Sequence, residues 1–308
     1  MRGKDLLSSS VSLRLREHGF AARFVSLEHL QELKDAIEKA HSEQLFDEEF
    51  YRSLRPWFDF SIPTDLPKVR SIIVAASPQP ALRVTFVWKR KSCEAIIPPT
   101  YVYDTDQRAY DCITGALKVE EYQLVKARVP EKLLAVRSGL ARYGKNNITY
   151  VEGMGSFQRL TAFYTDAPLF EQSWQEPQML DQCQTCTACV KKCPTGAIPS
   201  DRFLLRAEKC LTFHNESEAP FPEWIDPSWH NCLIGCMICQ NVCPVNQHFI
   251  DRVVHEATFS EEETDLILKC VPKENLQPET QEKLERINML KDFKLLSRNL
   301  KALLNARN

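Results

Sequence analysis

The sequence predicts an α+β fold in which strands and helices alternate without a regular βαβ rhythm. Three observations favour this class: short strand patterns lie among helical ones in residues 1–175, cysteines and prolines crowd residues 176–250, and residues 251–308 have helical periodicity. A chain of 308 residues is long enough for more than one domain. We therefore expect an α+β domain, a cysteine-rich domain and a helical C-terminal segment.

The first 175 residues combine both kinds of element. Amphipathic periodicity predicts helices, and short β-branched or alternating runs predict strands. The expected helices cover much of 1–60, most clearly 27–41, and then 106–127 and 130–143. The expected strands are 71–76, 82–88, 148–151 and 157–165.

The C-terminal segment is expected to be helical from Ser260 onward. Ser260 and Glu263 have the spacing of a capping box. Apolar residues then recur every three or four positions from Leu284 to Leu303, which gives one apolar face. We expect this face to pack on the body of the protein.

Composition is that of a soluble globular protein, with 44% apolar residues, 26% charged residues and a net charge of −2. This balance gives no global field for a polyanion, so an RNA partner would need a local patch, and the densest basic runs are 89–91 and 191–192. No apolar run could span a bilayer, and the N-terminus lacks a secretory signal. We expect a cytoplasmic protein without membrane partners.

Twelve cysteines are many for such a chain. Cys93, Cys112 and Cys270 stand apart and are expected to be ordinary buried thiols. The other nine lie between Cys183 and Cys243 at short gaps. Such spacing, in a chain that needs no disulfides to fold, indicates metal binding.

Two motifs define the metal site. The first is Cys183-x2-Cys186-x2-Cys189-x3-Cys193-Pro194, the bacterial ferredoxin spacing, in which the fourth cysteine binds a second 4Fe–4S cluster. The other is Cys236-x2-Cys239-x3-Cys243-Pro244, which has Leu233 where a further cysteine is expected. Two structural zinc sites are the alternative, but zinc knuckles rarely combine two Cys-Pro endings with this pattern.

The crossover rule assigns the ligands of two clusters. One cluster is expected to take Cys183, Cys186, Cys189 and Cys243. The other is expected to take Cys193, Cys236, Cys239 and a fourth ligand, for which spacing leaves Cys210 and Cys232 open.

Further motifs extend this pattern beyond the clusters. Gly139-x4-Gly144-Lys145-Asn146 is followed by a strand and by Thr165-Asp166-Ala167-Pro168-Leu169, and Lys209-Cys210-Leu211 stands between the cysteine motifs. Taken with the two cysteine motifs, these residues resemble epoxyqueuosine reductase. The resemblance is specific over residues 130–247 and loose elsewhere.

The resemblance implies a corrinoid-binding N-terminal domain, related in fold to flavin nitroreductases, before the ferredoxin-like domain. A donor such as flavodoxin or ferredoxin would supply electrons, the clusters would pass them singly to cobalamin, and reduced cobalamin would act on an epoxide of a modified tRNA base. The resemblance also implies Cys210 as the fourth ligand, which leaves Cys232 as a nearby thiol.

The resemblance further implies corrinoid contacts at Gly144, Lys145, Asn146 and Asn147. Taken alone, these residues predict only the end of a helix, with Gly144 just past it, and a charged turn.

One departure from the family concerns the proton donor. The family has an Asp-Ser-x-Pro segment whose Asp is thought to donate the proton, and that Asp falls on Val125 here. Candidate replacements are Glu131, Glu121, Asp111 and Tyr110, and the sequence selects none of them. We expect a cobalamin-dependent iron–sulfur reductase acting on an epoxide or related substrate. The alternative is an electron-transfer or corrinoid-activating protein without substrate chemistry of its own.

Overall fold

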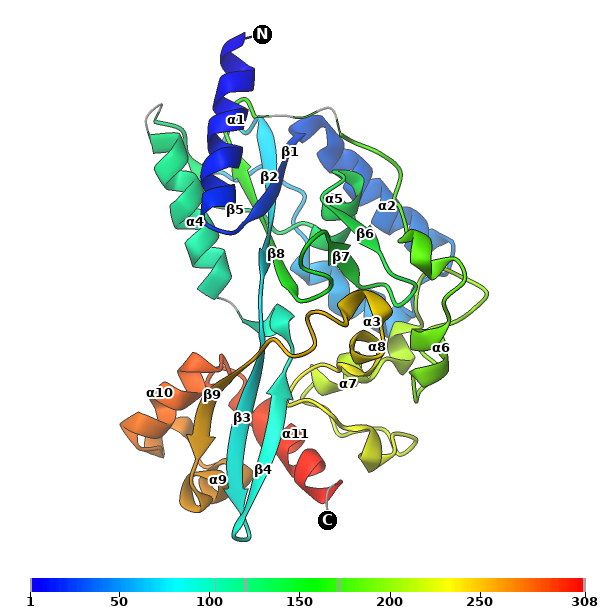
Figure 1. The fold of residues 1–308 in the computed structure, drawn as a ribbon, viewed down its shortest axis with the longest axis vertical. Coiled ribbons are helices and arrows are strands. Elements are labelled where there is room, and N and C mark those ends of the chain that lie inside the picture. The colour runs from blue at the N-terminus through cyan, green and yellow to red at the C-terminus, as the bar shows by residue number, and fades with distance from the viewer. Residues whose placement is uncertain (1, 103, 119–120, 170, 172, 307–308) are drawn as a thin grey trace. The chain divides into compact units, whose positions relative to one another are not determined.

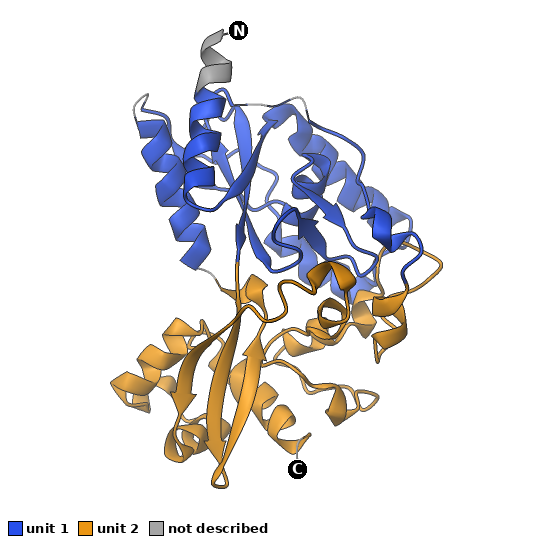
Figure 2. Cartoon of the chain, in the orientation of Figure 1, with its two compact units in different colours: residues 1–78, 103–186 blue, residues 79–102, 187–308 orange. Residues whose placement is uncertain are grey.

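A computed structural model describes residues 2–306 except 103, 119–120, 170 and 172. The chain divides into two compact units that are discontinuous in sequence (Figures 1 and 2). Unit 1 comprises Met1–Pro78 and Tyr103–Cys186, and unit 2 comprises Gln79–Val102 and Thr187–Asn308. The α+β class is confirmed. The division into domains 1–175, 176–250 and 251–308 stays a prediction. In packing, residues 79–102 belong with the C-terminal half of the chain, whereas the prediction placed them in the first domain.

Unit 1 is built on an antiparallel sheet of four strands in the order β1-β2-β8-β5. The strands are β1 (Ala21–Ser26), β2 (Ser71–Pro78), β5 (Leu124–Lys126) and β8 (Gln158–Thr165). In β2, Ile72 and Val74 belong to one apolar core, and Ile73 and Ala75 belong to another. The apolar run that predicts this strand is therefore a strand buried on both faces.

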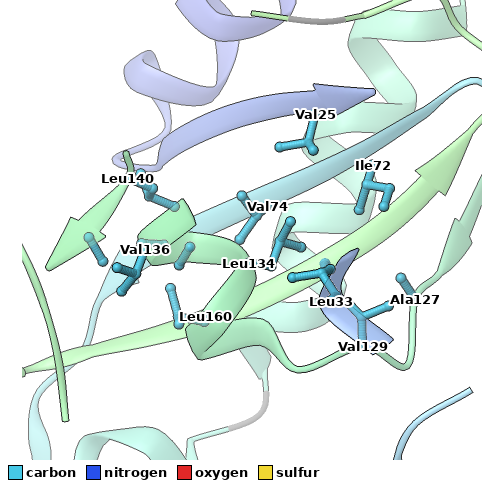
Figure 3. Packing of buried hydrophobic residues seen from close by; sticks show 14 of the residues in the cluster. Val25, Leu33, Ile72, Val74, Ala127, Val129, Leu134, Val136, Leu140 and Leu160 are labelled. Carbon is cyan, nitrogen blue, oxygen red and sulfur yellow. The ribbon is translucent and has the colours of Figure 1, made fainter. Parts of the chain in front are cut away.

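Helices cover both faces of this sheet. The core on one face includes residues of α1 (Arg2–Glu17) and α4 (Asp104–Leu117). The core on the other face includes residues of α2 (Leu30–Ser42) and α5 (Glu131–Arg137). Figure 3 shows this second core, with Val74, Leu134 and Leu160 gathered between α5 and the sheet. Unit 1 also contains α3 (Glu48–Leu54) and a hairpin of β6 (Ala141–Tyr143) and β7 (Thr149–Val151).

Two predicted helices are too long. The helix expected over 106–127 ends at Leu117, and residues 124–126 form β5 instead. The helix expected over 130–143 ends at Arg137, because Gly139 takes the left-handed conformation (φ 72°) and β6 follows. Gly144 is therefore in the β6–β7 turn and does not end a helix. Strands of three residues carry no periodicity, so only their neighbours stabilise them.

Unit 2 contains a sheet in the order β4-β3-β9. The hairpin of β3 (Ala81–Trp88) and β4 (Lys91–Ile97) is antiparallel, and β9 (Val253–Phe259) adds to β3 in parallel. The rings of Phe86 and Phe259 stack across that pairing at 5.0 Å between centroids. Sequence patterns predicted β3 but not β4 or β9.

The C-terminal helices are α9 (Glu261–Leu268), α10 (Pro278–Arg286) and α11 (Phe293–Asn305). The capping box of Ser260 and Glu263 is confirmed. The predicted apolar face is also buried, with Leu284, Leu296 and Leu300 at most 1% exposed, but it is divided between α10 and α11.

The cysteine-rich region consists of short helices joined by loops: α6 (Ala188–Lys192), α7 (Leu211–Asn215) and α8 (Ile238–Asn241). Helix α11 holds these loops, because the buried Asn299 amide donates to the carbonyls of Asn215 (2.9 Å) and Leu233 (2.7 Å). The chain also has 3-10 turns at Leu27–His29, Arg55–Trp57, Pro99–Tyr101, Asp181–Cys183, Ala207–Lys209, Pro227–Trp229, Pro244–Asn246 and Lys273–Asn275. Within the described residues, no helix is both long and apolar enough to cross a bilayer.

Candidate functional site

None of the twelve cysteines forms a disulfide. Of the eight predicted ligands, Cys183 and Cys189 are buried, and the other six are partly buried. Among the isolated cysteines, Cys112 is buried and Cys93 is partly buried, but Cys270 is exposed, so the prediction of a buried thiol is wrong there. Cys270 follows the end of α9 in a left-handed conformation (φ 51°), where the chain turns away from the helix.

The charges of neighbouring cysteines affect two predicted ligands of the second cluster, Cys210 and Cys236. Cys193 follows α6, Cys210 precedes α7, and Cys236 lies just before α8. Burial raises the pKa of Cys210, and the charge of Cys193 raises it further. Burial raises the pKa of Cys236 to about 11, and the charges of Cys210 and Cys193 act in the same direction. Neighbouring buried thiols of this kind become thiolates when a metal supplies the positive charge.

Cys232 lies beside the same group of thiols. Its side chain is 1% exposed, and its Sγ donates a hydrogen bond to Asn231 Oδ1 at 3.1 Å. Burial raises its pKa well above the ordinary value, and the charges of Cys236 and Cys239 add to this effect. Cys210 and Cys232 are thus both near cysteines of the second site, and the choice of Cys210 as ligand stays a prediction.

Within the described part of the chain, no three His, Cys, Asp or Glu side chains are placed around a single metal ion. The ferredoxin spacing of the cysteines is the observation that favours 4Fe–4S clusters over zinc sites.

The predicted corrinoid contacts lie in the turn between β6 and β7. Asn146 is 3% exposed, and its amide serves the turn itself, donating to Tyr150 Oη (3.1 Å) and accepting from the Ile148 amide (3.2 Å). A Cβ on Gly144 would come within 2.5 Å of the Tyr150 ring, so a larger residue there would displace that ring. Asn147 takes the left-handed conformation (φ 60°).

Lys145 connects this turn to the first cysteine motif. Its Nζ donates to the backbone carbonyl of Cys186 at 3.0 Å. A hydrogen bond therefore connects this turn to the segment that carries the first cysteine motif. Its contact with a corrinoid stays a prediction.

A charged network that the sequence did not predict joins four elements of unit 1. Arg159 on β8 donates from Nε and Nη2 to the two carboxylate oxygens of Asp106 on α4, at 2.8 and 2.9 Å. Lys126 on β5 places its Nζ 3.1 Å from Asp106 Oδ2 and 3.4 Å from Oε1 of Glu131, the first residue of α5. Lys126 also donates to Thr161 Oγ1. Asp106, Arg159 and the segment with Lys126 and Glu131 are far apart in sequence, so no spacing rule could have brought them together.

The pKa values of the two carboxyl groups of this network, Asp106 and Glu131, are shifted in opposite directions. Burial acts to raise the pKa of Asp106, but the hydrogen bonds and charge of Arg159 outweigh it and the pKa is lowered. Burial raises the pKa of Glu131, and the charges of Lys126 and Arg159 offset this only in part. The Glu131 side chain is 28% exposed, so it can meet a ligand. The other candidate donors, Asp111, Glu121 and Tyr110, are exposed and lie outside this network.

Comparisons with known proteins agree with the motifs. Residues 182–246 match the family of 4Fe–4S double cluster binding domains. An epoxyqueuosine reductase from Cyclobacterium marinum is 38% identical over 122 residues, which are 39% of this chain and 38% of that protein. The Bacillus subtilis enzyme is 29% identical over 194 residues, which are 59% of this chain and 49% of that protein. The predicted resemblance to epoxyqueuosine reductase is confirmed.

The similarity in fold is more extensive. The structure of Bacillus subtilis epoxyqueuosine reductase with its catalytic aspartate loop swung out of the active site has a TM-score of 0.67 at 21% identity. A structure of epoxyqueuosine reductase with an epoxyqueuosine-modified tRNA-Tyr stem loop has a TM-score of 0.67 at 19% identity. Each covers 97% of this chain and 81% of the other chain. In sequence, the chain spans only 38% of the length of the first relatives that it matches.

Proposed function

We propose that this chain is a cobalamin-dependent iron–sulfur reductase of the epoxyqueuosine reductase type, acting on an epoxide of a modified tRNA base in the cytoplasm. The observation that carries the proposal is a double cluster binding domain at residues 182–246, set within a fold that resembles epoxyqueuosine reductase over 97% of the chain. The domain match alone would support only an iron–sulfur protein, and the similarity in fold alone would support only a shared architecture.

The thiols supply the positions for the clusters. Cys193, Cys210, Cys236 and Cys239 would hold the second cluster, which agrees with the effect of the Cys193 charge on Cys210 and of both charges on Cys236. Cys183, Cys186, Cys189 and Cys243 would hold the first by the ferredoxin spacing. The clusters would relay electrons from a donor such as flavodoxin or ferredoxin.

Unit 1 has a buried polar atom that fits a corrinoid. The Gln158 side chain is 6% exposed, and its Nε2 donates to Thr149 Oγ1 at 3.0 Å, beside the β6–β7 turn. Its Oε1 is buried without a hydrogen-bond partner in the described structure. The amide groups on a corrinoid rim could donate to it, while Gly144, Lys145, Asn146 and Asn147 would form the adjacent wall. When bound, cobalamin would supply a strongly reducing cobalt centre.

Glu131 is our candidate for the acid that protonates the epoxide oxygen as its C–O bond breaks. A general acid must carry a proton at the working pH and be accessible. Its side chain is 28% exposed, and partial burial raises its pKa, so it keeps a proton to higher pH than an ordinary glutamate. Lys126 would orient the carboxyl group through its contact at 3.4 Å.

The hairpin tip of unit 2 is our candidate for the RNA contact. Lys89, Arg90 and Lys91 are exposed, and none of them takes part in an ion pair among the described residues. Lys89 lies over the Trp88 ring, with its Nζ 4.1 Å from the centroid. Cations beside an aromatic ring suit a phosphate backbone with accessible bases.

The test begins with protein purified and reconstituted without oxygen. It is titrated with cob(II)alamin while the electron paramagnetic resonance of cobalt is followed, and is then given epoxyqueuosine tRNA and a reductant. We expect a changed axial-ligand pattern at one equivalent, followed by loss of the epoxide. A spectrum of free cobalamin throughout would refute the proposal.

The alternative is a corrinoid-activating or electron-transfer protein without its own substrate. Val125 and Lys126 favour it, because no carboxylate stands where the family has its Asp. Reduction of a partner's corrinoid, with no conversion of epoxyqueuosine tRNA, would identify this function.

A further inference from the structure

The side chain of Asn231 occupies a central position beside the cysteines of unit 2. Its Nδ2 donates to the backbone carbonyl of Trp229 at 2.9 Å and to Cys236 Sγ at 3.3 Å. Its Oδ1 accepts from the backbone amide of Met237 at 2.9 Å and from the thiol of Cys232 at 3.1 Å. All the main hydrogen-bonding positions of this amide are therefore used.

The backbone fixes which end of the amide faces the sulfur of Cys236. The Trp229 carbonyl can only accept, so it must face Nδ2, and the Met237 amide can only donate, so it must face Oδ1. The second hydrogen of Nδ2 is then directed to Cys236. The Cys232 thiol holds the other end in place by donating to Oδ1.

We propose that Asn231 raises the reduction potential of the second cluster by donating an N–H···S hydrogen bond to its ligand Cys236. A reduced cluster carries more negative charge on its sulfurs than an oxidised one, so a donor stabilises the reduced state. Asn231 is a positioning residue that acts through Cys236. The inference rests on the cluster part of the proposed function and needs neither cobalamin nor tRNA.

The same arrangement gives Cys232 a role other than ligand. Its proton is engaged with Asn231, and the side chain is almost fully buried. It therefore acts as a neutral donor that steadies the amide. The eight other cysteines of the region are sufficient for two clusters.

The test is a redox titration of the reconstituted full-length protein, followed by electron paramagnetic resonance of the reduced clusters. Asn231→Asp keeps the size and both accepting contacts, removes the donors to Cys236 and to the Trp229 carbonyl, and adds negative charge. We expect a lower potential for one cluster and no change for the other. Asn231→Leu removes the donor without adding charge, and we expect a smaller shift in the same direction.

A matched control separates this effect from a general change of charge. Asn288→Asp makes the same chemical change in unit 2, where the Asn288 amide donates to the Tyr101 carbonyl (3.5 Å) and not to a sulfur. We expect neither potential to change. Cys232→Ala should keep the full iron content and cause only a small shift.

Three results would overturn the inference. The first is an unchanged potential in both Asn231 variants at full iron content. Another is the failure of both variants to assemble the second cluster, since Asn231 would then be structural. The third is loss of a cluster in Cys232→Ala, which would make Cys232 a ligand. Because the readout is the cluster potential, a protein without reductase activity would still test it.

Discussion

Units 1 and 2 bury ionisable groups in opposite ways. In unit 1, Asp106 is neutralised by Arg159 and Lys126, which are close enough to donate hydrogen bonds. In unit 2, Cys236 and Cys210 are raised in pKa by burial and by the charges of other cysteines. Protein groups alone hold Asp106 as a carboxylate, whereas Cys210 and Cys236 would become thiolates only if positive charge came from outside the chain, as a metal cluster would supply.

The largest expected effect tests the dependence of unit 2 on metal. Cys210→Ala should remove one cluster and about half of the iron, because the ferredoxin arrangement gives each cluster four thiolates. It should also lower the melting temperature of the reconstituted protein, since metal binding contributes to folding. Iron analysis and calorimetry measure both effects. Cys270→Ala, at an exposed cysteine, is the control. Full iron content in Cys210→Ala would show that the fourth ligand is another group.

The next effect concerns the one carboxyl of the unit 1 network that is only partly neutralised. Glu131→Gln should lower turnover of epoxyqueuosine tRNA by about 10²–10⁴-fold, the usual contribution of a general acid. Cobalamin and iron content should not change. In the unaltered protein the rate should fall as pH rises through the raised pKa of Glu131, because only the protonated acid can donate. The control is Glu121→Gln, at an exposed carboxyl, which should be fully active. If Glu131→Gln were as active as this control, Glu131 would not be the general acid.

A smaller effect tests the contribution of the Arg159–Asp106 pair to the stability of unit 1. Arg159→Met leaves Asp106 without its two-point partner, and should lower the free energy of unfolding by about 2–4 kcal/mol at neutral pH. The folded-state pKa of Asp106 is lowered, so its stabilisation is present above its unfolded pKa and is lost as pH falls through the folded one. Urea unfolding at neutral and acidic pH should therefore show that the difference in free energy of unfolding between Arg159→Met and the unaltered protein becomes smaller in acid.

The matched control for Arg159 is another Arg–Asp pair in unit 1. Arg142 lies 3.1 Å from Asp181, but the two side chains are 51% and 78% exposed. Arg142→Met should change stability by less than about 1 kcal/mol, as exposed pairs do. Equal effects of the two substitutions would remove the distinction between a buried network and a surface pair.

The smallest effect concerns the β3–β4 hairpin of unit 2. Lys89 and Arg90 both have positive φ (49° and 63°), a conformation that favours Asn-Gly. Replacing them with Asn and Gly should stabilise the protein by about 1 kcal/mol. If the tip binds RNA, the same change should weaken binding and flatten its salt dependence. Unchanged binding of a tRNA stem loop would exclude the tip as a contact.

Sequence patterns predicted best where the chemistry is local. The central strand β2 was predicted because a run buried on both faces is apolar at every position. The capping box at Ser260 was predicted because its two partners are three residues apart. The double cluster domain was predicted from two- and three-residue gaps between cysteines, and the match at 182–246 agrees.

The remaining features depend on distant partners. Lys126 and Arg159 meet Asp106 only because β5 and β8 pair beside α4. The helix over 130–143 was drawn too long because Gly144 looks like a helix end, whereas Gly139 takes that role. The contact of Asn231 with Cys236 depends on the conformation of a loop, and loops have no hydrophobic periodicity from which their conformation could be predicted.

The parallel pairing of β9 with β3 also has a consequence for synthesis on the ribosome. The β3–β4 hairpin is made between two parts of unit 1, but its partner Phe259 follows only after the cysteine-rich region. At about 5–20 residues per second, Phe86 waits on the order of ten seconds for its stacking partner. During that time the edge of β3 is open to other chains, so the nascent protein is most vulnerable to aggregation until β9 has emerged.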